Sequence, residues 1–296
     1  MNKLFKCLDD SHEQVEREYI FHVMTENLRK RIHEANVEFH RFEAKYYELI
    51  HPEIFNRIEQ KRLVSTLRKV DKLIDDNQKK ALDFGAGTGN LTCKLLNMGY
   101  EVTAVDISAE MCELLKDRYV SYLRNKRLRV INSKIEDISF SRDKFDLITC
   151  YSVLHHLPDY VDVIRKLTFL LKKGGVVYLD HEESPFIWDQ SQNHKKLQHI
   201  YLTSNWYLDF LTNRIRRSLN ITRSRSLIDY ALADYWTRKK EHRLDHKKIE
   251  HVFEEENFTF LIREDYHLHK TRILNPIFYI YKFTCKPDMS LWIARK

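Results

Sequence analysis

A glycine-rich turn, residues 82–90 (LDFGAGTGN), is the run in this sequence that most clearly suggests chemistry. The apolar residues before it are typical of a buried strand, and the run after it is typical of a helix. Glycines at 85, 87 and 89 permit a tight turn whose bare backbone approaches a ligand closely. The start of the helix adds free N–H groups and a partial positive charge. The spacing differs from the G-x-G-x-x-G of dinucleotide enzymes, which argues against a nicotinamide dehydrogenase.

A carboxylate, Asp106, ends the next β-rich run, residues 101–107 (EVTAVDI). It follows Gly85 by about 20 residues, the separation expected of an acid that binds ribose hydroxyls. One carboxylate can accept hydrogen bonds from both hydroxyls of a ribose. The alternative interpretation is that Asp106 caps the helix that follows. The glycine turn and Asp106 together are more specific for a nucleoside ligand than either one alone.

A second reactive group begins with the adjacent histidines His155 and His156, which follow the run FDLITCYS. Asp180 ends a later apolar run, and His181 and Glu182 follow it. The carboxyl ends of parallel strands are where α/β sheets bind ligands, and histidine is the usual general base near neutral pH. Two alternatives stay open: the histidines only pack and cap the turn, or they bind a divalent ion together with the acids.

An alternation of strands and helices must position these residues. Residues 1–80 read as amphipathic helices, and residues 81–184 alternate β-rich runs with helical patterns, which predicts a parallel sheet covered by helices on both faces. Residues 185–240 are rich in aromatic and basic residues and are expected to form a helical cap inserted after the fifth strand. Residues 241–296 supply the last helix and two closing strands.

The composition of the 296 residues bounds the class of protein. No apolar run is long enough to span a bilayer, and the first residues lack the apolar stretch of a secretory signal. The five cysteines are odd in number and none lies in a C-x-x-C pair, which fits a reducing cytoplasm. The net charge of +7 lies entirely in residues 185–296, because the net charges of residues 1–80 and 81–184 cancel each other. A basic face of this kind attracts phosphates, acidic substrates or acidic lipids.

The runs LDFGAGTGN, AVDIS, FDLITCYSVLHHLPD and LKKGGVVYLD occur in this order and resemble the class I S-adenosylmethionine (SAM)-dependent methyltransferases. The resemblance is closest to their small-molecule branch, similar to quinone-biosynthesis and sugar or natural-product O-methyltransferases. It covers about residues 45–184, and the closing run SLWIARK looks like the seventh strand of the family. It implies a Rossmann-like α/β fold: a seven-stranded, mostly parallel, doubly wound sheet with N-terminal helices and the cap.

The resemblance also implies a role for individual residues in binding SAM and its product S-adenosyl-L-homocysteine. The implied cofactor-binding residues are Asp83, Gly85, Ala86, Gly87, Gly89, Asp106, Ile107, Ile135, Cys150, Tyr151 and Tyr47. Lys134 stands where the family has an acid against the adenine amine. The implied catalytic residues are His155, His156 and Asp180, beside the methyl acceptor. No metal is expected.

The expected activity is methyl transfer to a small molecule, at a hydroxyl oxygen, with a His or Asp as general base. An apolar or acidic acceptor would lie under the cap and the N-terminal helices. Two alternatives stay open: methylation of RNA, although no RNA-binding module is recognisable, and a degenerate SAM-binding scaffold. We expect a cytoplasmic monomer or homodimer without a membrane span, whose basic cap is available for peripheral contact with a membrane.

Overall fold

The computed structural model describes residues 30–38, 40–41, 44–75, 79–186, 243–269 and 276–296. Seven strands share one sheet. Their bounds are β1 Lys80–Phe84, β2 Glu101–Asp106, β3 Leu128–Asn132, β4 Phe145–Tyr151, β5 Leu171–Glu183, β6 Phe260–Tyr266 and β7 Met289–Arg295. The sequence places all seven strands correctly, because each is a short β-rich run bounded by turn residues.

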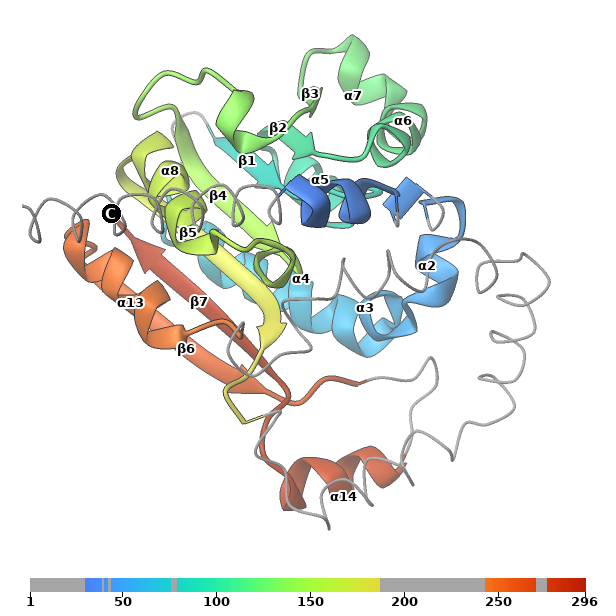
Figure 1. Cartoon of the computed structure of the whole chain (residues 1–296), viewed down its shortest axis with the longest axis vertical. Coiled ribbons are helices and arrows are strands. Elements are labelled where there is room, and N and C mark those ends of the chain that lie inside the picture. The colour runs from blue at the N-terminus through green and yellow to red at the C-terminus, as the bar shows by residue number, and fades with distance from the viewer. Residues whose placement is uncertain (1–29, 39, 42–43, 76–78, 187–242, 270–275) are drawn as a thin grey trace, which may run out of the picture.

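The strand order is β3-β2-β1-β4-β5-β7-β6, and every neighbouring pair is parallel except the two pairs that β7 makes (Figure 1). β7 runs antiparallel between β5 and β6. The predicted seven-stranded, mostly parallel, Rossmann-like sheet is therefore confirmed. The helical cap predicted for residues 185–240 falls almost entirely outside the described residues.

The helices are short, and several are single turns. Those of the first half are the 3₁₀ turn η1 Ala44–Tyr46, α2 Tyr47–Ile50, α3 Pro52–Phe55, α4 Arg57–Asp71, α5 Asn90–Asn97, α6 Ala109–Arg118 and α7 Val120–Arg124. The second half holds η2 Ile135–Asp137, η3 Leu154–His156, α8 Tyr160–Leu170, α13 His246–Glu255 and α14 Pro276–Thr284. Residues 30–38 and 40–41 are also helical. No helix among the described residues is long and apolar enough to cross a bilayer.

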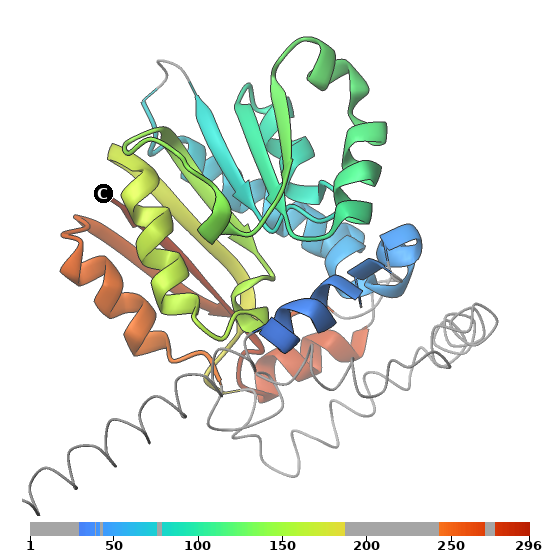
Figure 2. The ribbon, with the colours of Figure 1, turned by 45° about the horizontal axis from the view of Figure 1, so that its top comes forward.

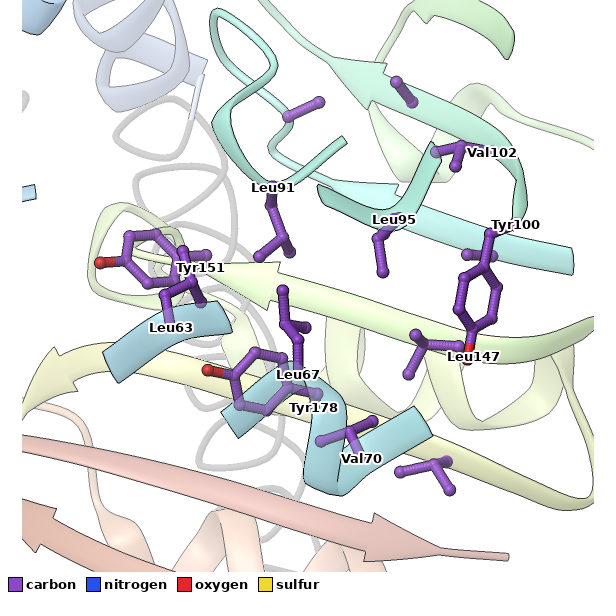
Figure 3. Packing of buried hydrophobic residues seen from close by; sticks show 14 of the residues in the cluster. Leu63, Leu67, Val70, Leu91, Leu95, Tyr100, Val102, Leu147, Tyr151 and Tyr178 are labelled. Carbon is purple, nitrogen blue, oxygen red and sulfur yellow. The ribbon is translucent and has the colours of Figure 1, made fainter. Parts of the chain in front are cut away.

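The core has two halves, one on each face of the sheet, because successive strand residues point to opposite faces. Helices α4 and α5 cover one face, where Leu63 and Leu67 of α4 approach Leu91 of α5 and Tyr178 of β5 (Figure 3). Helices α8 and α13 cover the other face, over Leu82, Ile148, Val177 and Trp292 and their neighbours. Figure 2 shows the sheet between these helical layers. A doubly wound sheet of this kind leaves the carboxyl ends of its strands open for a ligand.

Helix α4 is joined to the sheet by a buried ionic cluster around Arg62. The guanidinium donates to both carboxylate oxygens of Glu59 and, at 2.8 Å, to Asp180 on β5. Its flat face lies 3.9 Å from the ring centroid of Tyr266 on β6. The N-terminal helices are therefore fixed beside the carboxyl ends of β5 and β6, at one side of the ligand edge.

Helix α14, between β6 and β7, is an element that the sequence analysis missed. Its sequence is apolar on both sides of the helix, which hides its helical period. It lies apart from the layered helices, beyond the ends of β5 and β6 (Figure 1).

Candidate active site

A pocket opens where the carboxyl ends of β1, β2 and β4 meet the N-terminal helical segment. Its wall is formed by five segments of the chain. The lining residues are His33, Asn36, His40 and Tyr47; Phe84, Gly85 and Gly87; Val105, Asp106, Ile107 and Met111; Ser133, Lys134 and Ile135; and Tyr151, Ser152, Val153, His156, Leu157 and Val163. The structure thus brings together Tyr47, Gly85, Gly87, Asp106, Ile107, Ile135, Tyr151 and His156 of the predicted set.

The glycine turn has the backbone conformation that its residues permit. Gly85 and Gly87 have φ of +71° and +52°, in the left-handed region that favours glycine. A Cβ on Gly85 would lie 2.2 Å from Cγ2 of Val153, so the wall of the pocket closes directly over this position. Near Gly87 a Cβ would meet no atom within 4 Å. The turn therefore packs tightly on one side and is open on the other.

Asp106 is held by backbone N–H groups at the end of β2. Its Oδ2 accepts from the N–H of Gly87 at 2.8 Å, and its Oδ1 accepts from Ser108 at 2.9 Å. Ser108, whose hydroxyl accepts from the N–H of Met111, is the side chain that caps α6. The alternative that Asp106 is the N-cap is therefore wrong. Each carboxylate oxygen keeps a second lone pair, and burial raises the pKa of Asp106.

A smaller cavity adjoins the glycine turn on the side of α5, and Asp83 and Ala86 line it. Oγ1 of Thr88 and Nδ2 of Asn90 are buried there without a hydrogen-bond partner among the residues that the structure describes. A buried donor without an acceptor is costly, so these two groups fit a ligand that carries acceptor oxygens, such as an amino-acid carboxylate. Neither residue is among the cofactor-binding residues predicted from the sequence, although both lie in the glycine motif.

Asp83 lies beneath the turn and accepts from Thr92 at 2.5 Å and from Thr149 at 3.0 Å. Burial raises its pKa from 3.8 to about 6. Gly89 has a structural role, because it is the N-cap of α5. A Cβ at this position would lie 2.7 Å from the ring of Tyr119.

The N-terminal wall is the part of the pocket that the sequence predicted least well. Only Tyr47 was predicted, and its ring lies 4.4 Å from that of His51. His40 is new to the site: its ring lies 5.4 Å from that of His156, edge to face, and burial lowers its pKa to about 4. Asn36 reaches the carbonyl of His156 at 3.5 Å. These contacts connect the N-terminal helical segment to the turn after β4.

A buried carboxylate, Glu182, organises that turn. It accepts the N–H groups of Val153, Leu154 and His155 at 2.9, 2.8 and 3.2 Å. It also lies 2.8 Å from Nδ1 of His155. His155 is thus directed toward β5, whereas its neighbour His156 lines the pocket. The sequence shows Glu182 only as one of several acids after β5, so its role was not predicted.

Besides His155 and Gly89, the predicted site residues Cys150 and Asp180 also lie outside the pocket wall. Cys150, predicted to bind the cofactor, is fully buried within the sheet, where burial raises the pKa of its thiol, and it does not line the pocket. Asp180 is also fully buried and accepts hydrogen bonds from Tyr178 and Tyr266 besides its ion pair with Arg62. Both differ from the sequence expectation because alternation along β4 and β5 turns these side chains into the two halves of the core.

Two non-glycine residues at this edge, Ser152 and His181, have positive φ of 60° and 63°. Ser152 follows β4, and His181 lies near the end of β5. Nδ1 of His181 lies 3.3 Å from Oγ of Ser152. The imidazole of His181 also stacks on Tyr151 at 4.9 Å. Residues in this conformation cluster at functional sites, and these two bend the strand ends around the pocket. Among the described residues, no group of three or more His, Cys, Asp or Glu side chains is arranged to hold a metal ion.

Comparison with known proteins gives the family of this core. Residues 82–179 match the model of a family described as a methyltransferase domain. The ubiquinone biosynthesis O-methyltransferase of Vibrio parahaemolyticus is 35% identical over 124 residues, which are 42% of this chain and 51% of the relative. The enzyme of the same name from Haemophilus ducreyi is 32% identical over 104 residues, 34% of this chain and 44% of the relative. The chain thus matches about half of the length of these curated relatives.

Solved structures show the same fold at low sequence identity. A phosphoethanolamine N-methyltransferase of Haemonchus contortus, in complex with SAM, is similar with a TM-score of 0.53 at 14% identity, over 84% of this chain and 56% of that one. A SAM-dependent methyltransferase of Leishmania major gives a TM-score of 0.53 at 12% identity, over 90% and 83%. Residues 82–179 of this chain therefore match a methyltransferase domain, and the chain shares the fold of these SAM-dependent methyltransferases.

Proposed function

We propose that this protein transfers the methyl group of SAM to a hydroxyl oxygen of a small-molecule acceptor. The observation that carries the proposal is the pocket in which the glycine turn, Asp106 and the turn after β4 meet, since these are the parts that a nucleoside, a sulfonium and an acceptor require. The match to O-methyltransferases supports oxygen as the methylated atom.

Asp106 would accept the ribose hydroxyls through its remaining lone pairs, and Ile107 and Ile135 would flank the adenine. Lys134 lines the pocket where an acid was expected against the adenine amine, so the backbone near Ile135 would serve there instead. Thr88 and Asn90 would donate to the carboxylate of the methionine part, and Tyr47 would cover it from the N-terminal side. When bound, SAM supplies a methyl group on a positively charged sulfur.

His156 is our candidate for the group that takes the proton of the acceptor, because it is the member of the histidine pair that lines the pocket. His155, together with Glu182, would be a positioning residue that fixes the turn carrying His156. Asp180 would position the wall of the site through Arg62, since its carboxylate is buried away from the pocket. Orientation of acceptor and sulfonium would supply most of the rate.

The test has two stages. Calorimetry with the full chain should first show binding of SAM and of S-adenosyl-L-homocysteine. Methyl-labelled SAM is then incubated with a panel of hydroxylated aromatic acceptors, with and without the protein, and the products are separated. Labelled methyl ethers that His156→Ala loses, while it still binds SAM, support the whole proposal. Binding without transfer to any acceptor would favour a SAM-binding scaffold, and label in added RNA would favour RNA methylation.

A further inference from the structure

Helix α14 carries the most exposed large apolar side chains of the described residues. Phe283 is 83% exposed, Ile280 55% and Tyr279 50%. Lys282 and Lys286 are exposed beside them. Residues 279, 282 and 283 follow the i, i+3, i+4 spacing of one helix face. Lys286 lies two residues past the end of the helix, with its ammonium 5.1 Å from the ring centroid of Phe186. Aromatic and lysine side chains therefore form a stripe that faces solvent, and we call residues 279, 280, 282, 283 and 286 the α14 face.

The opposite side of α14 is fixed to the protein. Phe278 and Tyr281 are buried, and the hydroxyl of Tyr281 donates to Asp288 at 2.5 Å. The ring of His269 packs on Phe278 at 4.7 Å, and Nε2 of His267 lies 2.8 Å from the carbonyl of Cys285. Because this inner side is already packed, the α14 face cannot turn inward without breaking these contacts.

The stretch of sequence that contains the helix is basic. Residues 270–287 hold four basic residues and no acid, and all of the chain's net charge of +7 comes from residues 185–296. Asp288, the next acid, is fully buried. A second copy of the same face would bring like charges together, whereas an anionic surface would be attracted. Tyr and Phe beside lysine are the residues that lie at the boundary of headgroups and acyl chains.

The position of α14 in the fold adds a further argument. β5 ends at Glu183 and β6 ends at Tyr266, and both pair with Met289 of β7, so the two carboxyl ends lie at one edge of the sheet. α14 lies beyond the ends of β5 and β6 (Figure 1), and the pocket also opens at the carboxyl ends of strands of this sheet. Nδ2 of Asn56, the N-cap of α4, donates to the carbonyl of His269 at 2.6 Å and holds this edge together. A surface bound to the α14 face would lie beside the pocket, not behind the molecule.

We propose that the α14 face binds the surface of an anionic lipid bilayer, with Phe283 and Ile280 inserted and Lys282 and Lys286 at the headgroups. The proposal does not rest on methyl transfer. Each apolar group of this size and each lysine adds a modest contribution, so binding is peripheral and depends on both lipid charge and salt.

Vesicle co-sedimentation of the full chain tests the proposal. The protein should bind vesicles of phosphatidylcholine mixed with phosphatidylglycerol, bind phosphatidylcholine alone weakly, and dissociate as salt is raised. Phe283→Glu should lower the partition coefficient roughly tenfold or more, and the pair Lys282→Glu with Lys286→Glu should lower it comparably. The matched control is Phe169→Glu on α8, since Phe169 is 48% exposed and lies on another helix; it should bind as the unchanged protein does.

Thermal unfolding and SAM binding, measured on the same samples, show whether each variant is folded. Failure of the unchanged protein to bind anionic vesicles overturns the proposal, as does an equal loss in Phe169→Glu and Phe283→Glu. Sedimentation in the absence of lipid tests whether a second copy of the chain covers the α14 face. If Phe283→Glu converts a dimer to a monomer while vesicle binding is unchanged, the α14 face is an interface between copies, and the membrane proposal is wrong.

Discussion

Nδ1 of His155 lies 2.8 Å from Oε2 of Glu182, and the same buried carboxylate accepts three consecutive backbone N–H groups, those of residues 153–155. One side chain at the end of β5 therefore sets the shape of the turn that follows β4. The turn includes a wall of the pocket, so its shape and the position of His156 depend on a residue in another strand.

The first prediction concerns this turn. Glu182→Ala should lower the free energy of unfolding by about 2–4 kcal/mol, because buried donors lose their acceptor. Glu182→Gln keeps one acceptor oxygen and should lose less. Urea denaturation measures both, with Glu264→Gln as the control, since Glu264 is exposed on β6. A loss in Glu182→Ala no larger than in this control would show that the turn does not depend on the carboxylate.

The second prediction concerns the ribose site. Asp106→Ala should weaken SAM binding by roughly tenfold or more, because it removes the acceptor of the ribose hydroxyls and also releases the N–H of Gly87. Asp106→Asn keeps one acceptor and should bind with intermediate affinity. Isothermal titration calorimetry gives both affinities. Unchanged affinity in Asp106→Ala would remove this residue from the site, and Asp137→Ala, on an exposed residue nearby, serves as the control.

The third prediction separates crowding from backbone strain in the glycine turn. Gly85→Ala should destabilise the protein by about 2–4 kcal/mol, because the new Cβ meets Val153 and because φ is +71°. Gly99→Ala has a φ of +97° but no atom within 4 Å of the new Cβ, so it reports strain alone. Val153→Ala should recover part of the loss in Gly85→Ala and none of the loss in Gly99→Ala. An equal loss from Gly85→Ala with and without Val153→Ala would contradict the close packing of the turn.

The fourth prediction follows from Asp83, whose pKa is raised by burial from 3.8 to about 6. A raised pKa means that the neutral acid is preferred in the folded state. The stabilising contribution is therefore complete below pH 3.8 and is lost as pH rises through about 6. Since the shift is about two units, the loss is at most about 3 kcal/mol.

Asp83→Asn cannot ionise and should lack this dependence. The stability difference between the unchanged protein and Asp83→Asn should therefore move in favour of the variant between about pH 4 and pH 7. Chemical denaturation across this range measures it. A difference that stays constant with pH would show that Asp83 is ionised throughout, held by Thr92 and Thr149.

Periodicity and local motifs were sufficient for the sheet and for bringing Gly85, Gly87 and Asp106 together at one pocket. β1 and β2 are short apolar runs that end in the glycine turn and in Asp106, so order along the chain implies proximity at the sheet edge. The sequence could not show that α14 is a helix, because Phe278 and Tyr281 are the buried residues among its described side chains and its other side is apolar too.

The N-terminal wall could not be predicted for a different reason. His40 and Asn36 meet the turn at His156 through contacts between distant parts of the chain, and spacing within a helix does not say what it packs against. Asp180 was placed at the correct strand end but on the wrong side, because alternation along β5 directs it into the core, where Arg62 of α4 pairs with it. Glu182, two residues later, belongs to no recognisable motif and was not predicted, yet its carboxylate organises the turn after β4.

The place of β7 in the sheet bears on how the chain must fold during synthesis. β5 is complete at Glu183, yet the neighbour that pairs with its outer edge begins only at Met289. Until that late segment leaves the ribosome, β5 has an open row of backbone donors and acceptors next to the buried Tyr178 and Leu179. Nascent chains that stop between these two strands are therefore the ones we expect to aggregate or to engage chaperones, and the last strand closes the sheet as the final step.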